Sequence, residues 1–168
     1  MADDEVAGPV VRYVLDVDGF RIDEGDSMLA FDEYADPVRA AGYCEGAVVL
    51  ESPGREPLEL EDAVPFLVTH LCFGALGPLA DDRPVTVPFF LTGIDVVASV
   101  RDDEVWLDLA TGGRFHDEKR ATLRALYACG ARFAAFHARL WEGYPDRAGE
   151  VANLEAARAA AEAVVARV

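Results

Sequence analysis

The alternation of apolar and polar residues from Gly93 to Ala110 predicts a two-strand hairpin, because side chains alternate between the two faces of a strand. Asp102 and Asp103 would form its two-residue turn, with both residues at positive φ. This register places the apolar pairs on one face and predicts a half-buried ribbon. It pairs Arg101 with Glu104, Val100 with Val105, Ala98 with Leu107 and Val96 with Leu109.

A long amphipathic helix is expected to follow the hairpin, from about Asp117 to Trp141. At about 100° per residue, its apolar side chains fall on one face and its arginines on another. The apolar face consists of Leu123, Leu126, Tyr127, Gly130, Phe133, His137, Leu140 and Trp141. The other face carries Arg120, Arg124, Arg132 and Arg139. Hairpin and helix together form the centre of the predicted fold.

A second hairpin is predicted over Val10–Asp23, around the turn-forming pair Asp18-Gly19. Its register puts apolar pairs on the core face and an opposite-charge pair on the outer face, as in a sheet buried on one side. The core pairs are Val17 with Phe20 and Leu15 with Ile22, and the outer pair is Asp16 with Arg21.

The remaining segments give weaker patterns. Ala47–Glu51 reads as a short strand with Leu58–Leu60 as its returning partner. Residues Met28–Tyr34 suggest a strand and Pro37–Ala41 a helical turn. Pro84–Leu91 is expected at a sheet edge, because Pro88 cannot donate a ladder hydrogen bond.

Two further helices complete the prediction. Asp62 is expected to cap a helix from Ala63 to about Leu76, and this helix is apolar on nearly all sides, which places it in the centre. Glu150–Val168 is expected to be a peripheral C-terminal helix with a thin apolar stripe. We therefore predict one α+β domain over residues 1–168, with an antiparallel sheet of hairpins, a buried central helix, two C-terminal helices and a flexible acidic tail at 1–9.

Composition narrows the function classes. A hydrophobic content of 52% is that of a folded chain, and a net charge of −16 would repel nucleic acid and anionic membranes. Three cysteines without a Cys-x-x-Cys motif indicate reduced thiols, and the N-terminus lacks the features of a secretion signal. We therefore expect a cytoplasmic protein that binds neither nucleic acid nor membrane.

The run Tyr-Val-Leu-Asp-Val-Asp-Gly at positions 13–19 resembles the first motif of haloacid-dehalogenase-like phosphatases. The resemblance implies Asp16 as nucleophile, Asp18 as acid/base and a Mg²⁺ ion. The resemblance covers about seven residues, and Phe20 stands where a Thr or Val is usual. Lys119, the only lysine, is not followed by the acidic pair that would hold the metal ion. The β-α alternation of that family is also missing. We predict an Asp-Gly hairpin turn here, with a phosphatase as the alternative.

No other motif indicates catalysis. The histidines at 70, 116 and 137 and the three cysteines lie at no His-x₃-His or Cys-x-x-Cys spacing, so we predict neither a metal nor a cofactor. His137 falls on the apolar helix face and is expected to be a hydrogen-bonded core residue.

The arginine face of the long helix is the strongest interaction feature, because guanidinium groups suit carboxylate or phosphate partners. Surface charge runs usually need no partner, so internal ion pairs or simple solvation are the more common explanations. The internal partners would be the 101–104 turn or the acidic residues of the C-terminal helix, Glu150, Glu155 and Glu162. We predict a non-catalytic binding protein with a protein partner of basic or mixed charge, resembling immunity or antitoxin proteins in charge and size only. A structural module that dimerises through the C-terminal helices is a further alternative.

Overall fold

A computed structural model describes residues 8–168 as an α+β fold with two separate four-stranded antiparallel sheets. Sheet A has the order β2-β1-β3-β4 and sheet B the order β5-β6-β7-β8. The strands of sheet A are β1 (Val10–Val17), β2 (Phe20–Asp23), β3 (Glu45–Glu51) and β4 (Leu58–Ala63). Those of sheet B are β5 (Val85–Pro88), β6 (Asp95–Arg101), β7 (Glu104–Leu109) and β8 (Arg114–Glu118).

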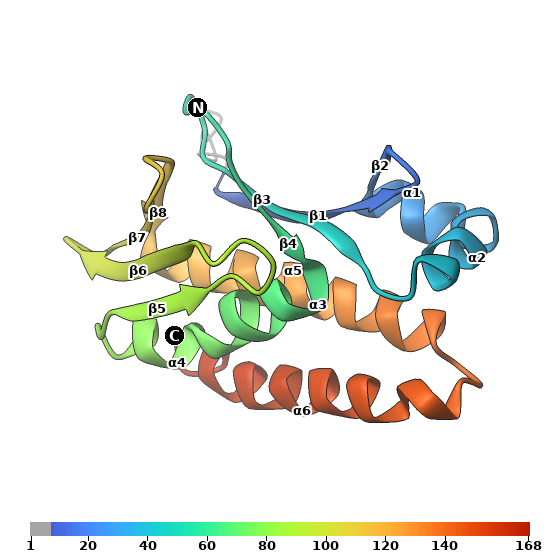
Figure 1. Cartoon of the computed structure of the whole chain (residues 1–168). Helices are drawn as coiled ribbons and strands as arrows, with labels where there is room; N and C mark the ends of the chain where they lie inside the picture. The colour runs from blue at the N-terminus through green and yellow to red at the C-terminus, as the bar shows by residue number, and fades with distance from the viewer. Residues whose placement is uncertain (1–7) are drawn as a thin grey trace, which may run out of the picture.

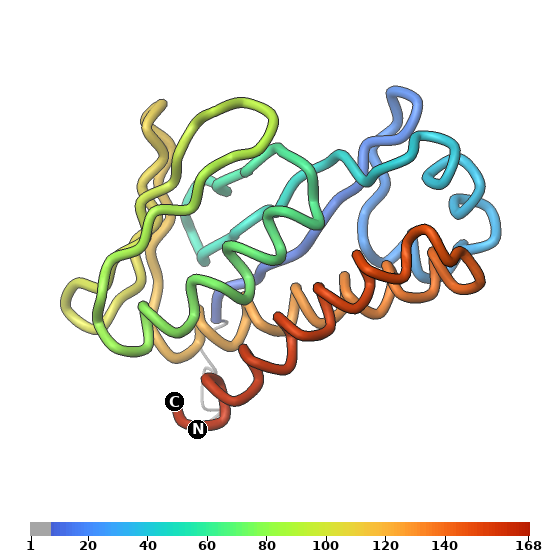
Figure 2. The backbone as a smooth tube through the Cα atoms, turned by 60° about the horizontal axis from the view of Figure 1, so that its bottom comes forward, coloured from blue at the N-terminus to red at the C-terminus, as the bar shows by residue number. Residues whose placement is uncertain are grey.

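The helices form the other layers of the molecule (Figure 1). They are α1 (Glu24–Leu29), α2 (Phe31–Ala41), α3 (Val64–Leu67), the π-helical segment η1 (Val68–Gly74), α4 (Leu76–Ala80), α5 (Lys119–Leu140), the 3₁₀ turn η2 (Pro145–Arg147) and α6 (Ala148–Val165). The long helix α5 runs between sheet A and α6, and Figure 2 shows α6 beside both α5 and the central helix. Most buried apolar side chains belong to the one core between these layers.

Both predicted hairpin registers are confirmed. In the first, Asp16 pairs with Arg21, and the turn residues Asp18 and Gly19 have φ values of 50° and 80°. In the second, Asp102 and Asp103 adopt φ values of 50° and 64°, as the two-residue turn requires. The pairs from Arg101–Glu104 to Val96–Leu109 are also as predicted. The core placement of Phe20 is wrong, because this side chain is 75% exposed on the edge strand β2.

The sequence suggested that both hairpins belong to one sheet, but the structure places them in two separate sheets. The chain leaves sheet A at the end of β4, passes through the central helix and only then begins sheet B. The strand β8 (Arg114–Glu118) was also missed, since it lies where the long helix was expected to begin. Helix α5 begins at Lys119, and the Glu118 side chain caps it by accepting hydrogen bonds from the Arg120 and Ala121 amides.

The segment 24–41 is helical, so the predicted strand Met28–Tyr34 is wrong. Phe31, Ala35 and Val38 are buried at the spacing of one helix face, a period that differs from the alternation of a strand. The strands near Ala47–Glu51 and Leu58–Leu60 are confirmed as partners, and β5 is the predicted edge strand of sheet B. The tail 1–9 lies outside the described residues except for Gly8 and Pro9.

The central helix lies where the sequence placed it, but it is not a regular α-helix. Its middle turns, Val68–Gly74, are π-helical, a form that occurs mostly as short insertions and frequently at functional sites. Asp62 does not cap it: this residue lies within strand β4, and its carboxylate accepts the backbone N–H groups of Phe90 and Leu91. Asp62 therefore ties the loop after β5 to sheet A.

Candidate binding site

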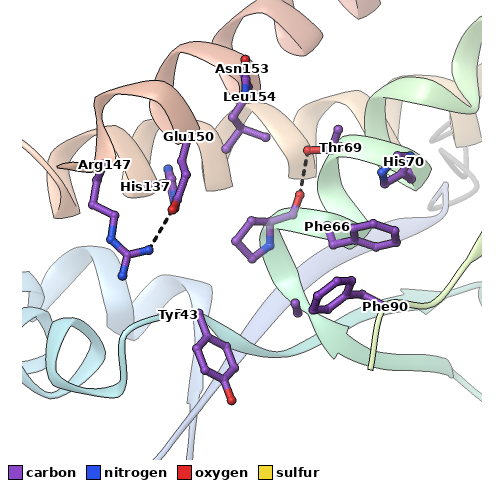
Figure 3. A pocket seen from close by; sticks show the side chains of 12 residues that line it. Tyr43, Phe66, Thr69, His70, Phe90, His137, Arg147, Glu150, Asn153 and Leu154 are labelled. Atoms are coloured by element: carbon purple, nitrogen blue, oxygen red, sulfur yellow. Dashed lines mark hydrogen bonds and ion pairs between the residues drawn. The ribbon is translucent and has the colours of Figure 1, made fainter. Parts of the chain in front are cut away.

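A hollow of about 530 Å³ opens between the first half of the central helix, helix α6 and the loop that follows β5. We call it the π-helix pocket, and Figure 3 shows its side chains. Its volume is within the range of small-molecule sites in proteins. The lining residues are Tyr43, Ala63, Pro65, Phe66, Thr69, His70, Phe90, His137, Arg147, Glu150, Asn153 and Leu154.

Aromatic side chains form one side of the pocket (Figure 3). The rings of Phe66 and Phe90 are 5.6 Å apart between centroids, and His70 lies 4.2 Å from Phe66. Phe90 is 69% exposed and Tyr43, elsewhere on the rim, is 53% exposed. Exposed aromatic rings around a hollow are a feature of interaction sites, because covering them removes apolar surface from water.

His137 reaches the pocket from α5 and is its most buried polar group, with 2% of its surface exposed. Its Nδ1 has no hydrogen-bond partner within the described part of the chain, although a hydrogen-bonded core histidine was expected. Burial lowers the pKa of His137 from its ordinary value of 6.5, so the ring is neutral at pH 7. A buried nitrogen without a partner costs about 1–3 kcal/mol, which a ligand hydrogen bond would recover.

The charged groups of the pocket form an ion pair. Arg147 Nη1 lies 2.8 Å from Glu150 Oε1, and Arg147 Nη2 donates to the Gly42 carbonyl at 2.6 Å. The same guanidinium lies over the Trp141 ring, 4.5 Å from its centroid. The one arginine of the lining is therefore held by contacts within the protein.

Little in the sequence indicates this site. The sequence analysis considered His70 and His137 as metal ligands and set them aside. The lining residues come from segments as far apart as 43 and 154. Histidine 70 was expected inside a buried helix and is instead exposed at the rim. A residue pattern at helical spacing does not distinguish α- from π-helical turns, so the irregular helix was not predictable.

The structure places Asp16 and Asp18 at the β1–β2 hairpin. Asp16 lies 3.6 Å from Arg21 Nε, and Asp18 is exposed in the turn. Strand β1 is antiparallel to both of its neighbours, whereas the phosphatase motif ends a parallel strand. Lys119 is engaged elsewhere, by Asp82 at 2.6 Å.

The four predicted arginines lie along the exposed face of α5, but three of them have contacts within the protein. Arg132 Nε is 2.7 Å from Glu24 Oε1, and its Nη2 donates to the Val11 carbonyl. Arg124 donates to the Val168 carbonyl, and Arg139 lies over the Phe31 ring. Their partners are not the acidic residues considered from the sequence, those of the C-terminal helix and the 101–104 turn. The side chain of Arg120 has no such contact within residues 8–168.

The other residues that could bind a transition metal, His116 and the three cysteines, are packed within the protein. His116 stacks on Trp106 at 3.9 Å between centroids, and its Nδ1 lies 3.0 Å from Glu104. All three cysteines are unpaired and buried, and burial raises the pKa of Cys44 to about 12, which leaves its thiol unreactive. No group of three or more His, Cys, Asp or Glu residues suited to a metal ion is found within residues 8–168.

Comparison of the chain with protein-family models, with curated proteins and with solved structures finds no match. Over the described residues, no helix has both the length and the apolar character needed to cross a lipid bilayer. The structure itself shows an α+β fold with a candidate ligand site next to its central helix and helix α6.

Proposed function

We propose that this chain is a non-catalytic binding protein that holds the apolar, aromatic part of a small ligand in the π-helix pocket. The observation that carries the proposal is the combination of an exposed aromatic wall with a buried, unpartnered imidazole nitrogen in one hollow. Apolar lining with a few convergent polar groups is the usual composition of a ligand site.

The expected energies are those of a small ligand. Removing apolar surface from water contributes roughly 25 cal/mol per Å², so covering Phe66 and Phe90 with one aromatic ring favours binding by a few kcal/mol. A hydrogen bond to Nδ1 of His137 would fix the orientation of the ligand, because that nitrogen is otherwise unpaired. Asp62 holds the backbone of Phe90 and so keeps the wall in place before the ligand arrives.

The test uses 2-phenylethanol as a neutral aromatic probe, followed by amide chemical shifts in NMR. Shifts are expected in the segments 65–70, 89–91 and 150–154, which surround the pocket. The variant Phe90→Ser should weaken binding about tenfold, the equivalent of ~1.4 kcal/mol. Phe20→Ser is the matched control, since Phe20 is equally exposed but lies on the β1–β2 hairpin. Equal affinity of the two variants, or an absence of shifts, would contradict the proposal.

A second candidate function is the binding of a protein partner of basic or mixed charge. The outer face of sheet A supports it: two arginines, Arg12 and Arg21, face five carboxylates there, which leaves three negative charges. The acidic residues are Asp16, Asp23, Glu51, Glu59 and Glu61. Such a face steers a positive partner in a salt-dependent manner.

A lysine-rich peptide is the probe for this second candidate. Its addition should shift the amides of β1–β4, and added salt should reverse the shifts. The double variant Glu59→Gln/Glu61→Gln is expected to weaken binding more than Glu56→Gln, which lies in the β3–β4 turn. Binding that is independent of salt or of these two glutamates would rule out this face.

A further inference from the structure

We propose that the ligand of the π-helix pocket is an organic cation, an amine attached to an apolar aromatic body. This inference rests on the proposed function and specifies the charge of the ligand. It follows from three features of the lining: the contacts that already hold its only arginine, the aromatic faces that no cation covers, and the carboxylate of Glu150 at the rim.

The pocket has no available positive group for an anion. Arg147 is the only Arg or Lys residue of the lining, and its guanidinium already contacts Glu150, the Gly42 carbonyl and the Trp141 ring. Binding a carboxylate or phosphate there would break these contacts. His137 is buried beside the Arg147–Glu150 pair and does not supply a charge at neutral pH.

The aromatic faces of the pocket are available to a cation. Elsewhere in the fold, arginines lie over the rings of Phe31, Trp106, Trp141 and Tyr144. No such cation covers Phe66 or Phe90 within the described residues. An ammonium group within about 6 Å of an aromatic face is attracted by the ring quadrupole, so these two rings favour a cationic ligand.

One acidic residue of the lining, Glu150, stands at the rim. Glu150 accepts a hydrogen bond from Arg147 through Oε1, its Oε2 has no hydrogen bond within residues 8–168, and half of its side chain, 52%, is exposed. A chain of net charge −16 adds a general preference for cations.

The neutral His137 completes the recognition of an amine. If Nε2 carries the ring proton, Nδ1 is an acceptor without a partner and can take one N–H of an ammonium group. The cation would then lie among a neutral imidazole, a rim carboxylate and aromatic faces. The aromatic body would fill the rest of the hollow against Leu154 and Pro65.

Three probes that differ chiefly in charge test this inference: phenethylamine, 2-phenylethanol and phenylacetate. At low salt we expect phenethylamine to bind about tenfold or more tightly than phenylacetate, with the alcohol between them. Added salt should narrow the difference between amine and carboxylate and leave the alcohol unchanged. The amide signals of segments 65–70, 89–91 and 150–154 should shift on binding of each of the three probes.

The variant Glu150→Gln should weaken the binding of phenethylamine several-fold more than the binding of 2-phenylethanol. Glu155→Gln on the same helix is the matched control, because Glu155 is paired with Arg158 outside the pocket. If the alcohol binds but the amine binds no better than phenylacetate, the cation inference is wrong and the proposed function stands. If none of the three binds in the pocket, the proposed function fails as well.

Discussion

Gly130 of α5 lies so close to the π-helical segment that a Cβ atom at this position would stand 2.6 Å from the ring of Phe73. The same atom would be 2.9 Å from Cβ of Cys72, so two neighbouring residues of the central helix press on one glycine. Only a residue without a side chain lets α5 and the central helix approach to this distance. Because this segment also lines the pocket, the contact links core packing to the site.

Gly130→Ala is expected to destabilise the protein by about 1–3 kcal/mol, because the added methyl group overpacks this contact. The better helix propensity of alanine, about 1 kcal/mol, offsets only part of the loss. Urea unfolding measures the change. Gly149→Ala in α6 is the matched control: nothing lies within 4 Å of its Cβ position, so its stability should be unchanged or raised. Equal effects of the two substitutions would show that the contact is loose.

The burial of His137 predicts a pH dependence of stability. Burial lowers the pKa of His137 below its ordinary value of 6.5, with Glu150 opposing and Arg147 adding to the effect. Below pH 6.5 the unfolded chain therefore binds a proton at His137 more readily than the folded chain does. The free energy of unfolding falls as the pH drops from 6.5 toward the lowered pKa.

Unfolding free energies at pH 7.5 and pH 5.5 test this, since the two values lie about one unit to either side of the ordinary histidine pKa. His137→Asn should show a smaller loss of unfolding free energy on acidification than the wild type. Other groups also titrate in this range, so the difference between variant and wild type is the relevant quantity. A loss that is unchanged in His137→Asn would contradict the assignment.

Asp62 is expected to govern the order of the Phe90 loop. Its carboxylate accepts the amides of Ala63, Phe90 and Leu91, and hydrogen bonds to a buried charge contribute about 1.5–3 kcal/mol each. Asp62→Ala should lower the unfolding free energy by several kcal/mol, speed hydrogen exchange at residues 90 and 91, and weaken 2-phenylethanol binding. Glu61→Ala, an exposed neighbour, should do none of these.

The arginines of α5 are expected to separate into structural and surface positions. Arg132→Gln should cost about 1 kcal/mol of stability, because it removes partly exposed contacts to Glu24 and the Val11 carbonyl. Arg120→Gln should leave stability unchanged in urea unfolding. If Arg120→Gln nevertheless weakens binding of an identified partner, the arginine face acts in recognition.

The phosphatase alternative has a direct test. We expect no Mg²⁺-dependent hydrolysis of p-nitrophenyl phosphate, because Asp16 is paired with Arg21 on an antiparallel hairpin. Asp16→Asn should behave as the wild type does. Hydrolysis by the wild type that disappears in Asp16→Asn would establish the catalytic alternative instead.

Local interpretation of the sequence succeeded where neighbours along the chain determine the outcome. The hairpins with turns at Asp18-Gly19 and Asp102-Asp103 were predicted in the correct register, because side-chain alternation and positive φ are local requirements. The apolar face of α5 was likewise correct, with Leu126 and Phe133 fully buried. The candidate site was not predictable from the sequence, since its lining comes from five separate regions of the chain.

By itself the sequence determined the α+β class, the two hairpins, the faces of α5 and the acidic surface. The tertiary structure alone decided the division into two sheets, the first turns of the helix at 31–41, the π-helical turns and the pocket that they border. The physical reason is the range of the interactions. Turn geometry and periodicity depend on residues a few positions apart, whereas the pocket depends on how Phe66, Phe90 and His137 pack across the core.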